Sequence, residues 1–139
     1  MSKPTHADAM LFMEYYKLWD SPIDGEAWQL FRSLSQDGVF DDVEAFSERV
    51  PRGSREYVLF DRVCCSFEQA GVLMKHDLMH PDLYFDAWAS PTSVWARVRP
   101  VVEALRELRG SPQLYVNFEW LAKAGESWYA SHDPTVAGQ

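Results

Sequence analysis

The sequence contains few cysteines, and the two that it has, Cys64 and Cys65, are adjacent. Neighbouring residues on a helix point about 100° apart, so an internal disulfide is not expected. Two free thiols are typical of a protein from a reducing compartment. Either thiol could be a nucleophile or a redox sensor if its pKa were lowered. The apolar residues around them favour buried, structural thiols instead.

The chain also lacks the segments that direct a protein to a membrane and the motifs of common enzyme classes. It has no run of about 18 apolar residues, and its start, MSKPTHADAM, has no apolar run of the signal-peptide type. We therefore expect a cytoplasmic protein with no membrane partner. The motifs GxSxG, GxGxxG, CxxC and the P-loop are absent. No catalytic residue and no cofactor are expected, and an enzymatic role is disfavoured but stays open.

Positive charge is scarce in the first third of the chain. Between residues 8 and 48, ten acidic residues are balanced only by Lys17 and Arg32, which gives this segment a net charge of −8. The whole chain also carries −8, so the remainder is neutral. The negative charge argues against binding to nucleic acid or to an anionic membrane, and it allows a basic protein partner. An acidic surface that only aids solubility would explain the same pattern.

Apolar and aromatic residues, by contrast, are plentiful. Hydrophobic residues make up 47% of the 139 residues and aromatic residues 14%, with six Trp. A chain of this length is expected to form a single domain, residues 1–139, and to bury roughly 70% of its unfolded surface. The aromatic content is high for a monomer of this size, and a large core or a buried subunit interface would absorb it. We therefore expect a homodimer.

The apolar residues recur at helical spacing through most of the chain. This pattern predicts an all-α fold, a compact bundle of five to seven helices around a central helix near residues 55–75. Flexible tails are expected near residues 1–6 and 132–139. Ser54 is placed to cap the central helix. Gly71 in its interior predicts a close crossing with another helix, because glycine costs roughly 1 kcal/mol against alanine there.

Two proline positions predict breaks in the second half of the chain. Pro100 lies inside a helical pattern and predicts either a kink or a helix that begins at Arg99. The sequence Gly110-Ser111-Pro112 predicts the end of one helix and, directly after it, the start of the last one. These breaks would make consecutive helices antiparallel neighbours.

The layout of the C-terminal half resembles a known bacterial family. A long apolar helix carries Asp61 and Glu68, an arginine-rich helix follows, and the segment 115–122 closes the pattern. The arginines are Arg97, Arg99, Arg106 and Arg109. Through this layout, residues 55–130 resemble the family known as domain of unknown function 4760, whereas the first 50 residues carry no such resemblance. The resemblance implies a helical fold and supplies no established activity.

One face of the expected central helix carries polar groups that could form a site. Asp61 and Glu68 are seven residues apart and share this face, with Cys65 between them. A carboxylate on a mostly buried helix needs a partner, or its pKa rises. The arginine-rich helix is the expected source, so Asp61, Cys65, Glu68, Arg99 and Arg106 form a candidate site for a small anion or for acid–base chemistry. A structural salt-bridge network, or carboxylates that reach solvent, would explain the same residues.

The only closely spaced histidines are His76 and His80. Their i, i+4 spacing would place two imidazoles on one face of an unbroken helix, as a divalent metal site requires. Pro81 disfavours helix at His80, and no HExxH motif supplies a general base. Two surface histidines at a helix end, where the helix dipole favours them, are the alternative.

These features together favour a noncatalytic domain that works by protein–protein contact, as a scaffold or regulatory module and as a homo-oligomer. The alternative is a small-ligand-binding protein or enzyme that uses a polar site between the face with Asp61 and Glu68 and the helix with Arg99 and Arg106.

Overall fold

The structure, a computed structural model, describes residues 2–87 and 91–132. Most of the predicted C-terminal tail, residues 133–139, lies outside these ranges. The described residues form seven α-helices and one short 3-10 turn, and none of them is in a strand. In chain order these are α1 (His6–Leu18), α2 (Pro22–Gln36), η1 (Val39–Asp41), α3 (Val43–Arg49), α4 (Arg55–Lys75), α5 (Pro81–Ala87), α6 (Pro91–Arg109) and α7 (Val116–His132).

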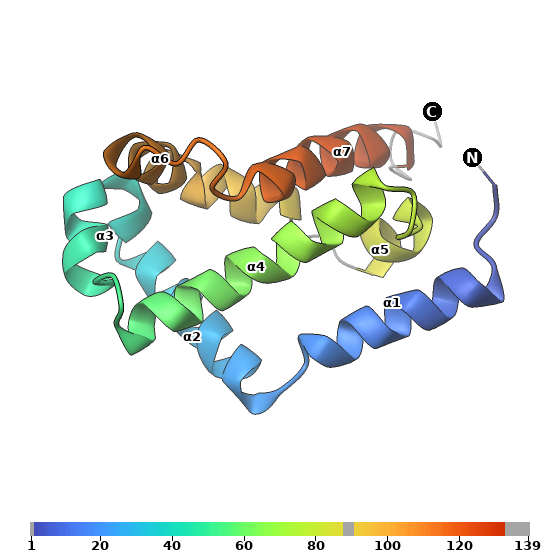
Figure 1. The fold of residues 1–139 in the computed structure, drawn as a ribbon, viewed down its shortest axis with the longest axis horizontal. Helices are drawn as coiled ribbons and strands as arrows, with labels where there is room; N and C mark the ends of the chain where they lie inside the picture. The colour runs from blue at the N-terminus through green and yellow to red at the C-terminus, as the bar shows by residue number, and fades with distance from the viewer. Residues whose placement is uncertain (1, 88–90, 133–139) are drawn as a thin grey trace.

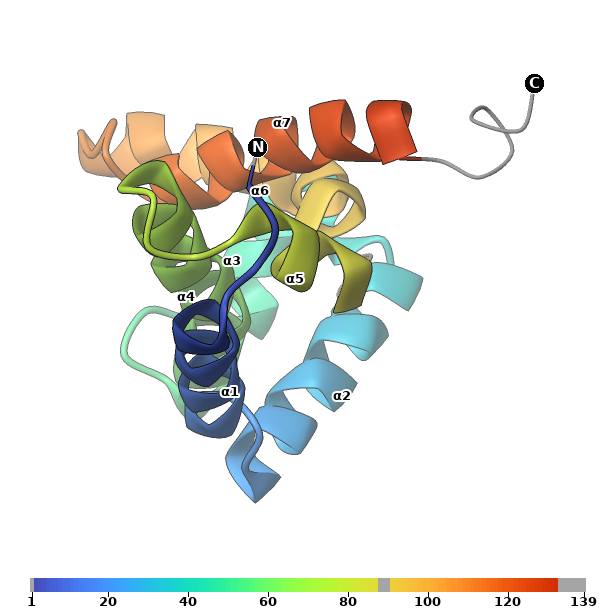
Figure 2. The same cartoon turned by 90° about the vertical axis from the view of Figure 1, so that its right-hand side faces the viewer.

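Helix α4 is the centre of the arrangement. It runs through the middle of the molecule, with α7 on one side and α2 on the other (Figure 1). The view from the side shows α7 along one edge and α1 and α2 at the opposite edge (Figure 2). The most extensive packing joins α4 to α7 and α2 to α4, followed by α6 to α7. The prediction of an all-α bundle around a central helix is confirmed.

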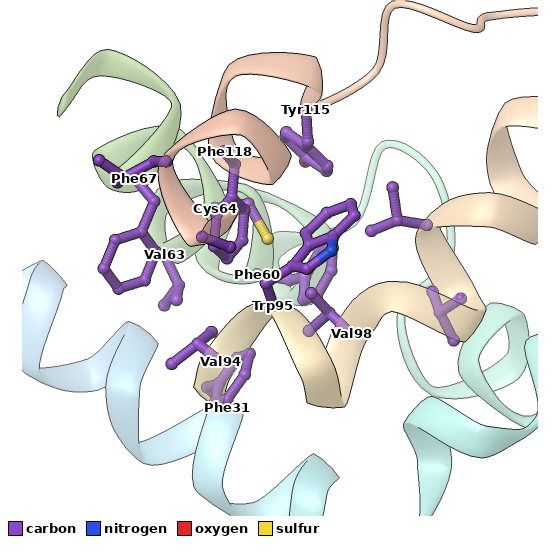
Figure 3. Close-up of a cluster of buried hydrophobic side chains, with 14 of the residues drawn as sticks. Phe31, Phe60, Val63, Cys64, Phe67, Val94, Trp95, Val98, Tyr115 and Phe118 are labelled. Atoms are coloured by element: carbon purple, nitrogen blue, oxygen red, sulfur yellow. The ribbon is translucent and has the colours of Figure 1, made fainter. Parts of the chain in front are cut away.

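The core is built on the apolar side of α4. Phe60, Val63 and Phe67 are buried there and meet residues of α6 and α7 (Figure 3). Phe67 stacks on Phe118 of α7 with ring centroids 4.8 Å apart, and Trp95 of α6 meets the same Phe118 ring edge-on at 5.2 Å. Aromatic pairs in these geometries add about 0.5–1.5 kcal/mol each beyond the area that they bury. The aromatic residues therefore join three helices into one core.

Ser54 fixes where α4 begins, and Gly71 marks where α7 crosses it. The Ser54 hydroxyl accepts a hydrogen bond from the Tyr57 amide at 3.1 Å, which confirms the predicted cap. Seventeen residues after Ser54, Gly71 lies against the backbone of Asn117, because a Cβ on Gly71 would be 2.2 Å from the Asn117 carbonyl oxygen. The close crossing predicted from Gly71 is confirmed, and α7 is the helix that makes it.

The last two helices differ from the prediction in their starting points. Helix α6 is continuous from Pro91 to Arg109 and includes Pro100, so it does not begin at Arg99. Helix α7 begins at Val116, not directly after Pro112. The intervening turn ends at Tyr115, whose backbone has a positive φ of 52°. A residue in this left-handed conformation cannot belong to a right-handed helix, so α7 begins after it.

The N-terminal helix is the least enclosed of the long helices. Tyr15 is its only buried residue, and the Tyr15 hydroxyl donates a hydrogen bond to the Ser66 carbonyl of α4 at 2.6 Å. Before it, Thr5 caps the helix, and the Ser2 carbonyl lies 2.7 Å from Nε2 of His80. Across the two described ranges, no helix has both the length and the hydropathy needed to cross a bilayer.

Candidate functional site

Glu68 is the carboxylate that joins α4 to the start of α7. Its Oε1 accepts hydrogen bonds from the backbone amides of Asn117 and Phe118, both at 2.9 Å, and its Oε2 accepts one from Nδ2 of Asn117 at 2.8 Å. The first amides of a helix have no partner within the helix, and their partial positive charge favours an anion. Glu68 therefore acts as a cap for α7 that is supplied by another helix.

Asp61 lies two turns before Glu68 on the same face of α4. It accepts a hydrogen bond from the Tyr115 hydroxyl and another, at 3.4 Å, from the thiol of Cys65. Burial raises the pKa of Tyr115 far above its usual value, and the neighbouring Cys64 and Asp61 raise it further, so the phenol keeps its proton and donates it. Asp61, Cys65 and Glu68 thus share one face of α4, and that face meets residues 115–118.

The arginines of α6 do not pair with these carboxylates in the described parts of the chain. Arg99 is exposed and donates to Glu103, four residues further along its own helix, at 2.5 Å. Arg106 donates to the Leu114 carbonyl and to Glu119 of α7, both at 2.8 Å. The expectation that α6 supplies the partners of the α4 carboxylates is wrong, because the start of α7 crosses α4 at that point and supplies hydrogen-bond donors itself.

Arg106 nevertheless has a defined position between α6 and α7. Its guanidinium carbon lies 5.5 Å from the centre of the Trp95 ring, a cation–π contact. The hydrogen bond from Arg106 is the main cause that lowers the pKa of Glu119. Its Nη2 atom is buried and has no hydrogen-bond partner among the described residues. Arg106 therefore anchors the turn before α7, and a ligand-binding role for it stays a prediction.

Both cysteines sit in surroundings that keep the thiol protonated. Burial raises the pKa of Cys64 well above its ordinary value, and nearby Asp61 adds to the shift. Burial and Asp61 together raise the pKa of the half-buried Cys65 to about 12. A thiol must lose its proton to act as a nucleophile, so this arrangement suppresses the reactivity of both cysteines.

The two histidines do not share a helix face. Helix α4 ends at Lys75, and His76 is its exposed C-cap. His80 is buried, with Nδ1 accepting from the Asp82 amide at 3.1 Å and Nε2 placed to donate to the Ser2 carbonyl. Both ring nitrogens of His80 are thus engaged, and the described ranges contain no group of three His, Cys, Asp or Glu residues that could hold a metal ion. Metal binding by His76 and His80 stays a prediction, and the described ranges place no third ligand beside them.

Sequence reasoning missed a buried ion pair between α2 and α4. Asp24 has 6% of its surface exposed and accepts hydrogen bonds from Arg62 at 2.6 and 3.2 Å. It also accepts from the hydroxyl and the amide of Ser21. Burial opposes ionisation of Asp24, but these hydrogen bonds outweigh burial and lower its pKa. The spacing of Ser21 and Asp24 was a local signal for the cap, whereas only the fold places Arg62 beside it.

The model of one family, described as "Domain of unknown function (DUF4760)", matches residues 7–128. This range includes residues 7–50, for which the sequence alone indicated no resemblance, so nearly all of α1 and the whole of α2 are part of the matched region. No curated protein and no solved structure matches the chain. Because the match covers far more than half of the 139 residues, the chain belongs to the DUF4760 family.

Proposed function

We propose that this domain is a noncatalytic protein-interaction module that forms a homodimer through the outer face of α1. We define this face as His6, Met10, Met13 and Lys17, which follow one another at intervals of three or four residues. Met10 is 70% exposed and Met13 is 51% exposed. The proposal depends on this observation, because two adjacent exposed methionines are an adaptable apolar contact surface.

The side of α1 that packs against the core is the side with Tyr15, and the methionines lie on the other side. Tyr15 is buried against α4 and α5, where it bonds Ser66 and meets the Tyr84 ring at 5.9 Å. At 100° per residue, Met10 and Met13 lie on the far side of the helix from Tyr15. Helix α1 thus has apolar residues on both sides, and within the described part of the chain only the side with Tyr15 is packed against other helices.

The charges beside the methionines suit contact with a second copy. Glu14 and Lys17 are 3.2 Å apart and largely exposed, with 71% and 66% of their side chains accessible. When two copies of α1 pack in antiparallel orientation, Met10 of each copy meets Met13 of the other, and the Glu14–Lys17 pair of each copy lies at the rim of the contact. A two-fold interface uses the same patch on both subunits, and this patch carries both signs of charge.

A separate acidic surface supports an additional basic protein partner. The carboxylates of Asp41, Asp42, Glu44 and Glu48 are exposed around η1 and α3. Arg49 and Arg52 are nearby cations, and Arg49 is engaged with Asp37 at 2.9 Å. Such a surface attracts a basic partner at long range, and this attraction weakens as salt screens it.

The internal polar groups support a noncatalytic role. Glu68 caps α7, Asp61 holds Tyr115 and Cys65, and each of these contacts stabilises the fold. The raised pKa of Cys65 works against nucleophilic chemistry. Asp61, Cys65 and Glu68 each have a partner within the fold, which favours the noncatalytic role over a ligand or acid–base site.

Size-exclusion chromatography with light scattering tests the homodimer. The wild-type chain should change from monomer to dimer between low and high micromolar concentration, and the double variant Met10→Lys/Met13→Lys should stay monomeric. A matched control is Val58→Lys/Leu108→Lys, because Val58 is 52% and Leu108 70% exposed, away from α1. A wild-type chain that stays monomeric at high micromolar concentration would contradict the proposal, and so would a double variant that dimerises like the wild type.

A further inference from the structure

A small cleft lies between α1, α2, α4 and α5, away from the outer face of α1. Its volume is about 370 Å³, within the range of roughly 300–1,000 Å³ that is usual for small-molecule sites. Its walls are aromatic: Tyr15, Tyr16, Trp19, Trp28, Phe67 and Tyr84. Arg32 and Ser66 complete the lining. We call this space the aromatic cleft.

The walls of the aromatic cleft are held by contacts with one another and with neighbouring side chains. The indole nitrogen of Trp19 donates to Gln69 at 2.7 Å, and the guanidinium of Arg62 covers the Trp19 ring at 5.0 Å. Trp28 meets the Phe67 ring edge-on at 6.0 Å. A site whose side chains are already held in place loses little conformational freedom when a ligand binds, which favours affinity.

Arg32 gives the aromatic cleft a single charge. It follows Trp28 by one helical turn on α2, so both side chains project from the same face of that helix. Arg32 is exposed, and none of the ion pairs in residues 2–87 and 91–132 involves it. No acidic residue is among the described residues that line the cleft. The guanidinium is therefore available to an anion at the rim.

We propose that the aromatic cleft binds a small, flat aromatic carboxylate. The ring of the ligand lies between the aromatic walls, where stacked and edge-on contacts are favourable. Aromatic faces carry partial negative charge, so the carboxylate cannot lie against them and is directed outward to Arg32. A planar guanidinium binds a carboxylate through two parallel hydrogen bonds, which fixes the orientation of the ligand.

Isothermal titration calorimetry with 2-naphthoate as the probe tests this site on the full chain. The wild type should show saturable binding, and 2-naphthamide, which has the same ring without the charge, should bind about tenfold more weakly, because a charged hydrogen bond is lost. The variant Arg32→Gln should weaken 2-naphthoate binding by about the same factor and leave 2-naphthamide unchanged. Arg32 is exposed, so this variant should keep the wild-type melting temperature.

The matched control is Arg97→Gln, which removes the same charge from an exposed position on α6 outside the cleft. It should bind 2-naphthoate like the wild type. The proposal is overturned if 2-naphthoate does not bind at millimolar concentration, if the amide binds as tightly as the carboxylate, or if Arg97→Gln weakens binding as much as Arg32→Gln. The dimer is tested separately, since Met10 and Met13 do not line the cleft and Arg32→Gln should leave the oligomeric state unchanged.

Discussion

Gly71 of α4 lies directly against Asn117 of α7. A Cβ built on Gly71 would be 2.2 Å from the carbonyl oxygen of Asn117 and 2.8 Å from its carbonyl carbon. Atoms at these distances overlap, and the obstructing atoms belong to backbone, which cannot rotate away as a side chain does. Only glycine permits this crossing, and the crossing brings the first amides of α7 to the carboxylate of Glu68.

Replacing Gly71 with alanine should destabilise the protein. Overpacking typically costs about 1–3 kcal/mol, and here it should exceed the gain of about 1 kcal/mol from the better helix propensity of alanine. We expect a net loss of about 1–2 kcal/mol in the free energy of unfolding, measured by urea denaturation. The control is Gly25→Ala in α2, because nothing lies within 4 Å of a Cβ at Gly25. That variant should be stabilised, and a Gly71→Ala variant that is also stabilised would contradict the crossing.

Removing the Glu68 carboxylate should loosen the start of α7. The variant Glu68→Ala leaves the amides of Asn117 and Phe118 without an acceptor and should cost about 1–2 kcal/mol, as the loss of a helix cap does. Glu68→Gln keeps one carbonyl oxygen for the two backbone amides and should lose less than alanine, although its amide nitrogen can no longer accept from Nδ2 of Asn117. Glu107→Ala, at an exposed position on α6, should change the free energy of unfolding by less than about 0.5 kcal/mol. If Glu68→Ala matched this control, Glu68 would not be a structural cap.

The Asp24–Arg62 pair should make stability depend on acid pH. Hydrogen bonds from Arg62 and Ser21 hold the folded pKa of Asp24 below its unfolded value of about 3.9. The stabilisation is complete above the unfolded pKa and is lost as the pH falls through the folded one. At pH 7, Asp24→Asn should cost about 2 kcal/mol, and the difference from the wild type should disappear well below pH 4. Asp20→Asn, at an exposed neighbouring position, serves as control, and a constant offset at all pH values would show that ionisation of Asp24 plays no part.

The two thiols should react slowly in the folded protein. With the pKa of Cys65 at about 12, the thiolate fraction at pH 8 is on the order of one in ten thousand. A chromogenic disulfide reagent should therefore modify the native chain far more slowly than the chain in guanidinium, where Cys64 and Cys65 are both exposed. Asp61→Asn should accelerate the reaction of Cys65, because it removes a negative charge that disfavours the thiolate. Rapid modification of the native wild type would show that the thiols are accessible and activated.

The sequence by itself determined what kind of fold the helices form and where the central helix begins. Helical spacing of apolar residues and the cap at Ser54 are properties of neighbouring residues. The crossing at Gly71 could also be predicted locally, because a glycine inside a long apolar helix lowers helix stability and so indicates a close contact. These features could be predicted because the interactions that produce them span only a few residues.

Only the tertiary structure decided which groups meet across helices. Glu68 was expected to face the arginines of α6, yet its partners are the amides of Asn117 and Phe118, 49 and 50 residues away in sequence. In the same way, Arg62 lies 38 residues from Asp24, and nothing local connects them. A carboxylate can be satisfied equally well by a guanidinium or by backbone amides, so its sequence context does not select between them. The helix that crosses α4 at Gly71 makes that selection, because it places its own unpaired amides within reach.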